Sequence, residues 1–401
     1  MHPREALHPR FAVRVLLVAG LLAGCHALPD ARVLEGPAPP SPERFCAWFG
    51  AASGTVLYFG EAAFWDRFRA AGGDPRADLL MPGPVRIGRF DLARGRFLEP
   101  VPVAASPEPG GTWDVLPRER PGAGTGLRIW FTTYFGPAGF IDLPQGQVRR
   151  LPEAGPGLNE LAPGPGETVV ATRYGRPDEP ARGAGSLVLL GPDGRMLDEL
   201  PLEVGSELLP LPKSVAFDPG RGEFWVNTDL VDARGLARGH DARILDRNGR
   251  ELVRYAEPEL QFPFFDREGR GYLAERAGRR LWLRLLPPGR PGEARPEGRR
   301  VLLDDAFPAG FDFVQEVVRS PGGPAVVTRW SGIVHLVDPA RPGAPRRIAL
   351  PRPDPEGLYY SAVLRGRRLC ATYCAGVRVT CVDLDEAVPG DVAEARGREA
   401  L

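Results

Sequence analysis

The sequence is poor in residue types on which catalysis and nucleic-acid binding often depend. Among 401 residues, lysine occurs once, at Lys213, and histidine occurs five times. A single lysine without a glycine-rich context excludes a P-loop, and the HExxH and GxSxG motifs are also absent. The 51 basic and 51 acidic residues are interspersed, so no basic surface for nucleic acid is predicted. Composition therefore indicates neither a nucleic-acid partner nor a common hydrolase motif.

No apolar run is long enough to span a membrane, but the run at the N-terminus has another meaning. Residues 11–22 are mostly apolar, yet this run of about 12 residues is short of the roughly 20 that a spanning helix needs. It follows Arg4 and Arg10 and ends in the sequence LAGC at Cys25. This pattern resembles the lipobox of bacterial lipoproteins, in which cleavage leaves an acylated cysteine at the N-terminus. The resemblance implies a signal peptide over residues 1–24, lipidation of Cys25 and anchoring to a membrane.

The residue after the cysteine bears on location within the cell envelope. It is His26, whereas Asp at this position is the usual signal for retention in the inner membrane. The resemblance therefore implies the outer membrane of the bacterial cell envelope, and leaves both the periplasmic and the outer side open.

We expect four regions in the chain: the signal peptide (1–24), a lipidated tether with an N-terminal closing strand (25–43), the folded domain (44–385) and a C-terminal tail (386–401).

Glycine and proline are abundant, with 50 and 45 residues, and they lie between short apolar runs, as in all-β domains. These runs form a repeat of seven units, each with two adjacent strands. The first strand ends near a glycine or aspartate, at 56–60, 129–136, 169–175, 224–229, 272–278, 326–332 and 369–376. The second follows at 87–91, 140–142, 187–191, 244–246, 281–285, 333–338 and 379–383. Successive units start about 40 to 55 residues apart, except for a first interval of about 70, and this spacing is typical of propeller blades.

We therefore predict an all-β fold, a β-propeller of seven blades, with six blades or a β-sandwich as the alternatives. The two ends of the chain support ring closure. No outer strand follows Asp383, whereas residues 31–35 form an apolar run without a hairpin partner. Pairing these segments would remove two exposed sheet edges.

Four cysteines besides Cys25 are disulfide candidates, because an exported protein folds in an oxidising compartment. If residues 375–376 form a two-residue hairpin turn, Cys370 lies opposite Cys381, and Cys46 is left for Cys374. Three full pairings are possible in principle. Metal ligation fits less well, since the paired CxxC spacing of zinc sites is missing.

Residues 212–227 read PKSVAFDPGRGEFWVN, and residues 264–273 repeat the pattern weakly as FFDREGRGYL. The first stretch resembles the strand–turn–strand signature of the gluconolactonase/senescence-marker and NHL-type propellers. The resemblance implies lactonases with a divalent cation, such as calcium, in the central channel. Lys213 stands where this signature has Asn, and the candidate ligands that the resemblance leaves are Asn159, Glu160, Asn227, Asp229 and Glu316.

The inner strands of a propeller line a central channel, and the loops leading into them form one mouth. The ligand-binding candidates at this mouth combine aromatic, acidic, basic and amide side chains: Arg44, Trp113, Asp114, Asn159, Glu160, Lys213, Gln261, Gln315, Glu316 and Tyr360. We identify no catalytic group. The leading hypothesis is a lipid-anchored, extracytoplasmic binding or scaffold module for a protein, peptide or glycan, without a cofactor. The alternative is a metal-dependent lactonase or related hydrolase with its site in the channel.

Overall fold

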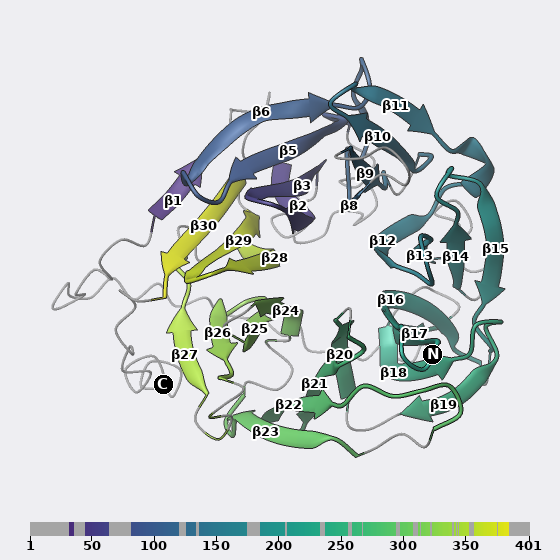
Figure 1. The fold of residues 1–401 in the computed structure, drawn as a ribbon, viewed down its shortest axis with the longest axis vertical. Coiled ribbons are helices and arrows are strands. Elements are labelled where there is room, and N and C mark those ends of the chain that lie inside the picture. Colours follow the sequence, from purple (N-terminus) through teal and green to yellow (C-terminus); the bar gives the residue numbers. More distant parts are fainter. Residues whose placement is uncertain are drawn as a thin grey trace, which may run out of the picture.

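The computed structural model describes residues 32–35, 45–63, 82–119, 126–133, 136–174, 185–204, 207–232, 237–255, 259–266, 268–293, 297–307, 312, 314–320, 323–338, 341, 343, 345–352, 357–374 and 376–384. Within this part of the chain, seven four-stranded sheets form a ring around a central channel (Figure 1). The fold is a seven-bladed β-propeller, so the all-β prediction is confirmed, with seven blades rather than six. Cys25 and Arg44 lie outside the described residues.

Each blade runs outward from the channel through consecutive strands. The inner strands are β2 (Phe45–Ser53), β8 (Val115–Glu119), β12 (Leu158–Pro163), β16 (Leu209–Asp218), β20 (Glu259–Phe265), β24 (Val314–Ser320) and β28 (Leu358–Arg365). The second strands are β3 (Val56–Ala63), β9 (Leu127–Phe131), β13 (Val169–Arg173), β17 (Glu223–Val231), β21 (Gly271–Ala277), β25 (Gly323–Thr328) and β29 (Arg368–Cys374). The third strands are β5 (Arg86–Asp91), β10 (Gly139–Leu143), β14 (Ser186–Leu190), β18 (Ala237–Leu245), β22 (Arg280–Leu286), β26 (Ile333–Leu336) and β30 (Val377–Asp383).

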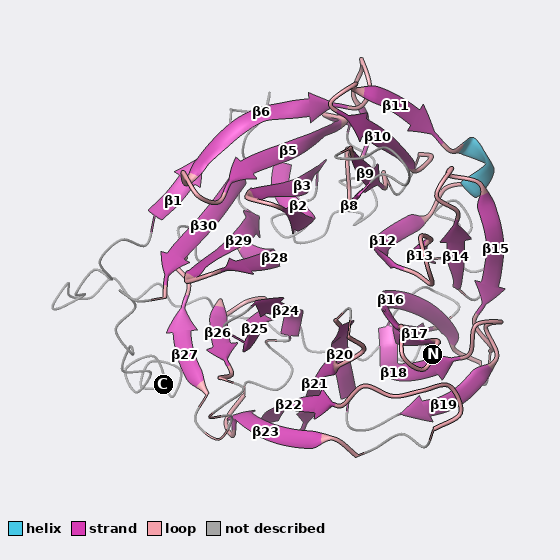
Figure 2. Ribbon diagram, viewed as in Figure 1, coloured by secondary structure: helices cyan, strands magenta, loops and turns pink. Residues whose placement is uncertain are grey.

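The outer strands are β6 (Arg96–Pro102), β11 (Gln147–Arg150), β15 (Met196–Pro201), β19 (Glu251–Tyr255), β23 (Arg299–Asp304), β27 (Arg346–Ala349) and β1 (Arg32–Glu35). A two-stranded sheet of β4 (Pro82–Gly83) and β7 (Glu108–Pro109) accompanies the blades. The one helical turn in Figure 2 is η2 (Pro152–Ala154). No helix in the described ranges has the length and apolarity needed to cross a membrane.

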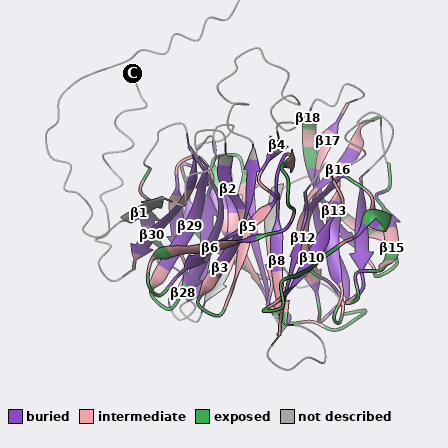
Figure 3. Cartoon of the chain, turned by 90° about the horizontal axis from the view of Figure 1, so that it is seen from above, coloured by how far each residue is buried: buried purple, intermediate pink, exposed green. Residues whose placement is uncertain are grey.

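The middle strands of the blades lack the alternation of apolar and polar residues that a half-buried strand shows. All five residues of β14 are buried, as are all six of β25, whereas β11 on the rim is mostly exposed. Figure 3 shows the same continuous burial along the second strands β13 and β29. Neighbouring blades cover both faces of each middle strand, which explains the continuous apolar runs in the sequence. Seven clusters of buried apolar side chains lie where blades meet, and each fully buried Val or Leu contributes about 1.5 to 3 kcal/mol.

The ring closes through the N-terminal strand. β1 pairs antiparallel with β30 and completes the last blade as its outer strand, with Arg32 opposite Cys381 and Glu35 opposite Arg378. This is the pairing expected between residues 31–35 and the strand that ends at Asp383. Closure from both ends of the chain leaves the last blade with four strands, as in the other six.

Two disulfides reinforce the last blade. Cys370 lies opposite Cys381 and is bonded to it, while Cys46 of β2 is bonded to Cys374 of β29. These are the pairs derived above from a two-residue hairpin turn, and Cys374 does lie opposite Val377. The bond between Cys46 and Cys374 joins the first blade to the last.

Candidate functional site

The antiparallel strands of each blade define two faces of the ring. We call the side on which the inner strands begin the upper face. The lower face carries the turns that join the inner strands to the second strands. The predicted mouth residues that the structure describes lie just before, at or just after the starts of the inner strands, and therefore toward the upper face.

The inner strands share an irregularity near the upper face. Against its second strand, each of six inner strands has one extra residue, which is the definition of a β-bulge. The register shifts lie between Ala47 and Gly50, Leu158 and Leu161, Pro212 and Ser214, Gln261 and Phe264, Val314 and Glu316, and Tyr359 and Ser361. A bulge turns a side chain away from its regular direction. The bulged stretches contain the predicted residues Glu160, Lys213, Gln315 and Tyr360.

Threonine hydroxyls in or just after the second strands accept backbone N–H groups near the starts of three inner strands, two of them at or beside a bulge. Thr172 Oγ1 accepts a hydrogen bond from the N–H of Glu160 at 3.0 Å, and Thr372 Oγ1 accepts one from the N–H of Ser361 at 2.9 Å. Thr132 Oγ1 does the same for Asp114 at 3.1 Å. A bulge removes an N–H from the strand ladder, and a buried N–H without an acceptor is costly. The threonines therefore stabilise the backbone that presents Asp114 and Glu160.

Aromatic side chains fill the space between the last, first and second blades. Trp48 stacks on Tyr360, with ring centroids 3.7 Å apart, and lies 4.7 Å from Trp113. Arg329 lies over the Tyr360 ring and donates a hydrogen bond to its hydroxyl at 2.6 Å. Trp113 and Tyr360 are buried, so these two predicted mouth residues contribute packing in this structure. Arg329, which the sequence did not single out, lies at the edge of this cluster.

Two predicted carboxylates connect neighbouring blades. Asp114 accepts hydrogen bonds from the N–H groups of Val115 and Leu161, both at 2.7 Å. Glu316 accepts one from the N–H of Ala362 at 2.6 Å. In each case the carboxylate reaches the inner strand of the next blade, just beyond its bulge. Asp114 and Glu316 therefore position the backbone of the adjacent blades around the channel.

The amide side chains lie in the same region. Gln315 donates a hydrogen bond from Nε2 to the carbonyl of Tyr360 at 3.1 Å. Its Oε1, like Oδ1 of Asn159 and of Asn227, is buried without a hydrogen-bond partner among the described residues. Gln261 lies in β20 at the edge of a bulge, and its side chain is outside the described part of the chain.

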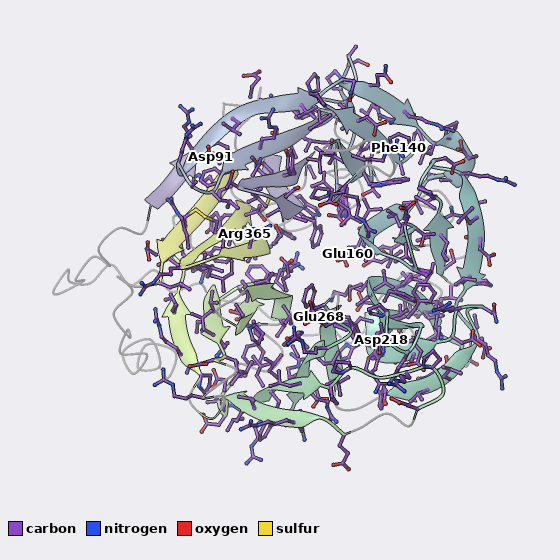
Figure 4. The ribbon with its side chains drawn as sticks, in the orientation of Figure 1. Asp91, Phe140, Glu160, Asp218, Glu268 and Arg365 are labelled. Carbon is purple, nitrogen blue, oxygen red and sulfur yellow. A yellow bond between two sulfur atoms is a disulfide. The ribbon has the colours of Figure 1, made fainter. Side chains whose placement is uncertain are left out.

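Glu160 differs from the other two acids of the mouth. Its half-buried side chain faces the channel (Figure 4) and makes no hydrogen bond or ion pair with the residues that the structure describes. Burial raises the pKa of Glu160 well above its usual value, and the carboxyls of Asp114 and Glu316 add to this shift. The cations Lys213 and Arg329 oppose the shift. Four ionisable groups from three other blades thus act on Glu160 at the channel mouth.

The other acids of this group are also perturbed. Burial raises the pKa of Asp114 to about 7, against the opposing effect of its two N–H donors. Burial raises the pKa of Glu316 to about 8, with the N–H of Ala362 opposing and Asp114 reinforcing the shift. Near neutral pH the mouth therefore holds protonated carboxyls beside two cations. Such a site can donate hydrogen bonds as well as accept them.

No group of three His, Cys, Asp or Glu side chains in the described part of the chain is arranged to hold a metal ion. Asp229 lies 3.8 Å from the ammonium group of Lys213, and the carboxylates of Asp114 and Glu316 already accept backbone N–H groups.

A cavity lies at the opposite end of the channel. On the lower face, a volume of about 1240 Å³ is lined by the ends of inner strands and their turns, including Gly54, Glu119, Phe217, Phe265 and Arg365. Charges of both signs and phenylalanine rings share its wall.

Comparison with known proteins agrees with this architecture. No model of a known protein family matches the chain, and no curated protein sequence does. Among solved structures, a catalytically inactive variant of virginiamycin B lyase from Staphylococcus aureus with quinupristin is similar, with a TM-score of 0.53 and 9% identity, over 88% of this chain and 100% of that chain. The selenomethionine-substituted form of the same lyase gives a TM-score of 0.52 and 9% identity, over 88% and 99%. At this identity the likeness concerns the fold alone, so the chain is similar in architecture to a propeller that serves as a lyase.

Proposed function

We propose that the protein is a lipid-anchored, extracytoplasmic binding module that holds a protein, peptide or glycan partner at the upper mouth of its channel. Acyl chains on Cys25 anchor it, and the outer membrane is the expected location. The resemblance of residues 1–25 to a lipoprotein signal and the resemblance of residues 212–227 to NHL-type propellers support this reading.

One observation carries the proposal. The Glu160 side chain faces the channel from a bulge, makes no hydrogen bond with the described residues, and lies in the field of Lys213 and Arg329. A partly desolvated carboxyl beside two cations offers a polar partner both donors and acceptors, and desolvation makes those hydrogen bonds stronger than in water. Asp114 and Glu316 support this position by holding the adjacent backbone.

A capture experiment tests the proposal. The chain from His26 onward, immobilised on beads, is incubated with a detergent extract of the bacterial envelope. We expect a defined species to be retained by the wild type and by a Glu167→Gln control, which alters an exposed acid on the lower face. The same species should be lost with Glu160→Gln, which keeps nearly the same shape. Equal retention by all three proteins would refute the assignment of the binding site to this mouth.

Melting curves separate the binding module from the lactonase alternative. They are recorded with EDTA and then with millimolar calcium, magnesium, manganese or zinc. A ligand at about a hundred times its dissociation constant stabilises the fold by about 2.7 kcal/mol, which raises the melting temperature by a few degrees. We expect no cation to do so. A rise with one cation would overturn this expectation and support a metal-dependent hydrolase.

A further inference from the structure

The closing strand determines where the tether meets the ring. β1 begins at Arg32, which lies opposite Cys381 near the end of β30. The chain after β30 lies at the lower face, because the N–H of Leu384 donates a hydrogen bond to the carbonyl of Arg367 in the turn between β28 and β29. The first residue of β1 therefore lies at the lower face of the last blade.

The length of the tether limits how far this face can be from an anchor. Six residues separate Cys25 from Arg32. A fully extended chain spans at most about 3.6 Å per residue, so the distance from Cys25 to Arg32 is at most about 25 Å. With an acylated Cys25 in the bilayer, the lower face of the last blade stays close to the lipid headgroups.

Exposed arginines surround this point on the lower face. We call the set of Arg94, Arg96, Arg346, Arg365 and Arg367 the arginine face, and all five side chains are exposed. They come from the turns and strand starts of the sixth, seventh and first blades.

Hydrogen bonds join these blades at the lower face. Arg346 donates a hydrogen bond to the carbonyl of Leu384, next to the Arg367 turn. Arg368 donates to the carbonyls of Leu92 and Ala93, beside Arg94. The arginines therefore form one continuous region around the start of β1.

Among the described residues, the arginines of this region outnumber the acids. Asp91 is the carboxylate beside Arg94, at 3.6 Å, but it also accepts the N–H groups of Ala93 and Arg94, and the Arg94 side chain stays 68% exposed. The other described acids here are Glu99 further along β6, Asp338 paired with Arg341, and the half-buried Asp383 opposite Arg368. Guanidinium groups bind phosphate oxygens in a bidentate geometry, which suits phospholipid headgroups.

We propose that the arginine face docks on anionic phospholipid headgroups of the membrane that carries the anchor, and that the upper mouth with Glu160 points away from the bilayer. This inference rests on the proposed lipidation of Cys25 for its geometry. It deepens the proposed function, because it leaves the binding mouth accessible to a partner in the surrounding compartment.

Vesicle binding tests the docking surface without the lipid. The chain from His26 onward keeps every described strand, including β1. It is sedimented with vesicles of phosphatidylcholine, with or without 30% phosphatidylglycerol as the anionic lipid. Each arginine near an anionic surface contributes about fivefold to binding, so Arg365→Gln with Arg367→Gln should weaken binding to the anionic vesicles about 25-fold. The matched control, Arg279→Gln with Arg280→Gln, changes two exposed arginines in the β21–β22 turn on the upper face and should leave binding unchanged.

Equal losses of binding for the two pairs of substitutions, or equal binding to vesicles with and without phosphatidylglycerol, would refute the assignment of the docking surface.

The orientation on the membrane is tested with the lipidated protein in the same vesicles. A fluorescent dye is attached through Arg365→Cys or Arg279→Cys, and spin-labelled lipid headgroups should quench the dye at residue 365 more strongly. Equal quenching would refute the orientation. Release of a Cys25→Ser variant from cell membranes tests lipidation separately, so its failure would contradict the anchor without affecting the vesicle result.

Discussion

A substitution at Glu316 tests how the ionisation of one carboxyl at the channel mouth affects stability. Burial raises the pKa of this carboxyl from 4.5 to about 8, so the folded state keeps a proton that the unfolded chain releases above pH 4.5. A group whose pKa is raised by folding contributes less stability as the pH rises, here between about 4.5 and 8. One pKa unit corresponds to about 1.36 kcal/mol, so the full shift corresponds to about 5 kcal/mol. Residual exposure to the channel reduces the expected effect to about 2 to 3 kcal/mol.

The substitution Glu316→Gln removes this ionisation and keeps an oxygen that can accept the N–H of Ala362. We therefore expect the variant to gain about 2 to 3 kcal/mol relative to the wild type between pH 5 and pH 8. Urea unfolding followed by tryptophan fluorescence at pH 5, 6, 7 and 8 measures the difference. Comparison with the wild type cancels the titrations of groups that do not interact with Glu316, such as buried His335, whose pKa is lowered to about 4 by burial and by Arg347. A difference between the two proteins that stays constant with pH would refute the reasoning.

Three further predictions concern ring closure, the bulges and the anchor. Replacing Cys46 and Cys374 with alanine opens a 328-residue loop, which costs about 6 kcal/mol in the chain-entropy model. Opening the 11-residue loop between Cys370 and Cys381 costs about 3 kcal/mol in the same model. The guanidinium midpoint of unfolding should therefore fall further for the first pair, and the reverse order would contradict a role in ring closure. Thr172→Val should lower the free energy of unfolding by about 1 to 3 kcal/mol, because the N–H of Glu160 loses its acceptor, whereas Thr172→Ser should lower it less. Equal melting temperatures for the two variants would exclude this role of the hydroxyl. Cys25→Ser should move the protein from the membrane fraction to the soluble fraction, and an unchanged distribution on immunoblots would reject lipidation.

The repeat and its closure could be predicted from the sequence because they depend on regular features. Apolar runs such as that of β13 reflect burial on both faces of a middle strand, and this does not change if the register shifts by one residue. The turn before Val377 fixed which cysteines face each other, since Cys370 and Cys381 are equidistant from it. The positive φ of 87° at Gly376 suits the hairpin turn there.

The directions of the side chains at the channel mouth could not be predicted from the sequence, because they depend on the register of the inner strands. One extra residue in an inner strand reverses the faces of all residues beyond it, so the sequence could not separate the buried Tyr360 from the channel-facing Glu160. Arg329 was missed because it follows β25 in a loop, and only the fold brings it to Tyr360. One signal was available, since threonine recurs at or just after the end of the apolar run in five second strands, at 132, 172, 228, 328 and 372. In three of these blades the hydroxyl accepts an N–H at the start of the inner strand.

The same recurring element explains how one ring can combine a rigid frame with a variable mouth. In the blades of Glu160 and Tyr360, a threonine hydroxyl accepts an N–H at or beside the bulge, so the bulged side chain is not needed to satisfy that group. The bulges hold glutamate in one blade, lysine in the next and tyrosine in another, and the tyrosine, Tyr360, also packs on Trp48. Carboxylates such as Asp114 then connect the bulged strands across blades. A binding surface built in this way changes its chemistry by substitution at the bulges alone, which is what we expect of a propeller that acts as a recognition platform.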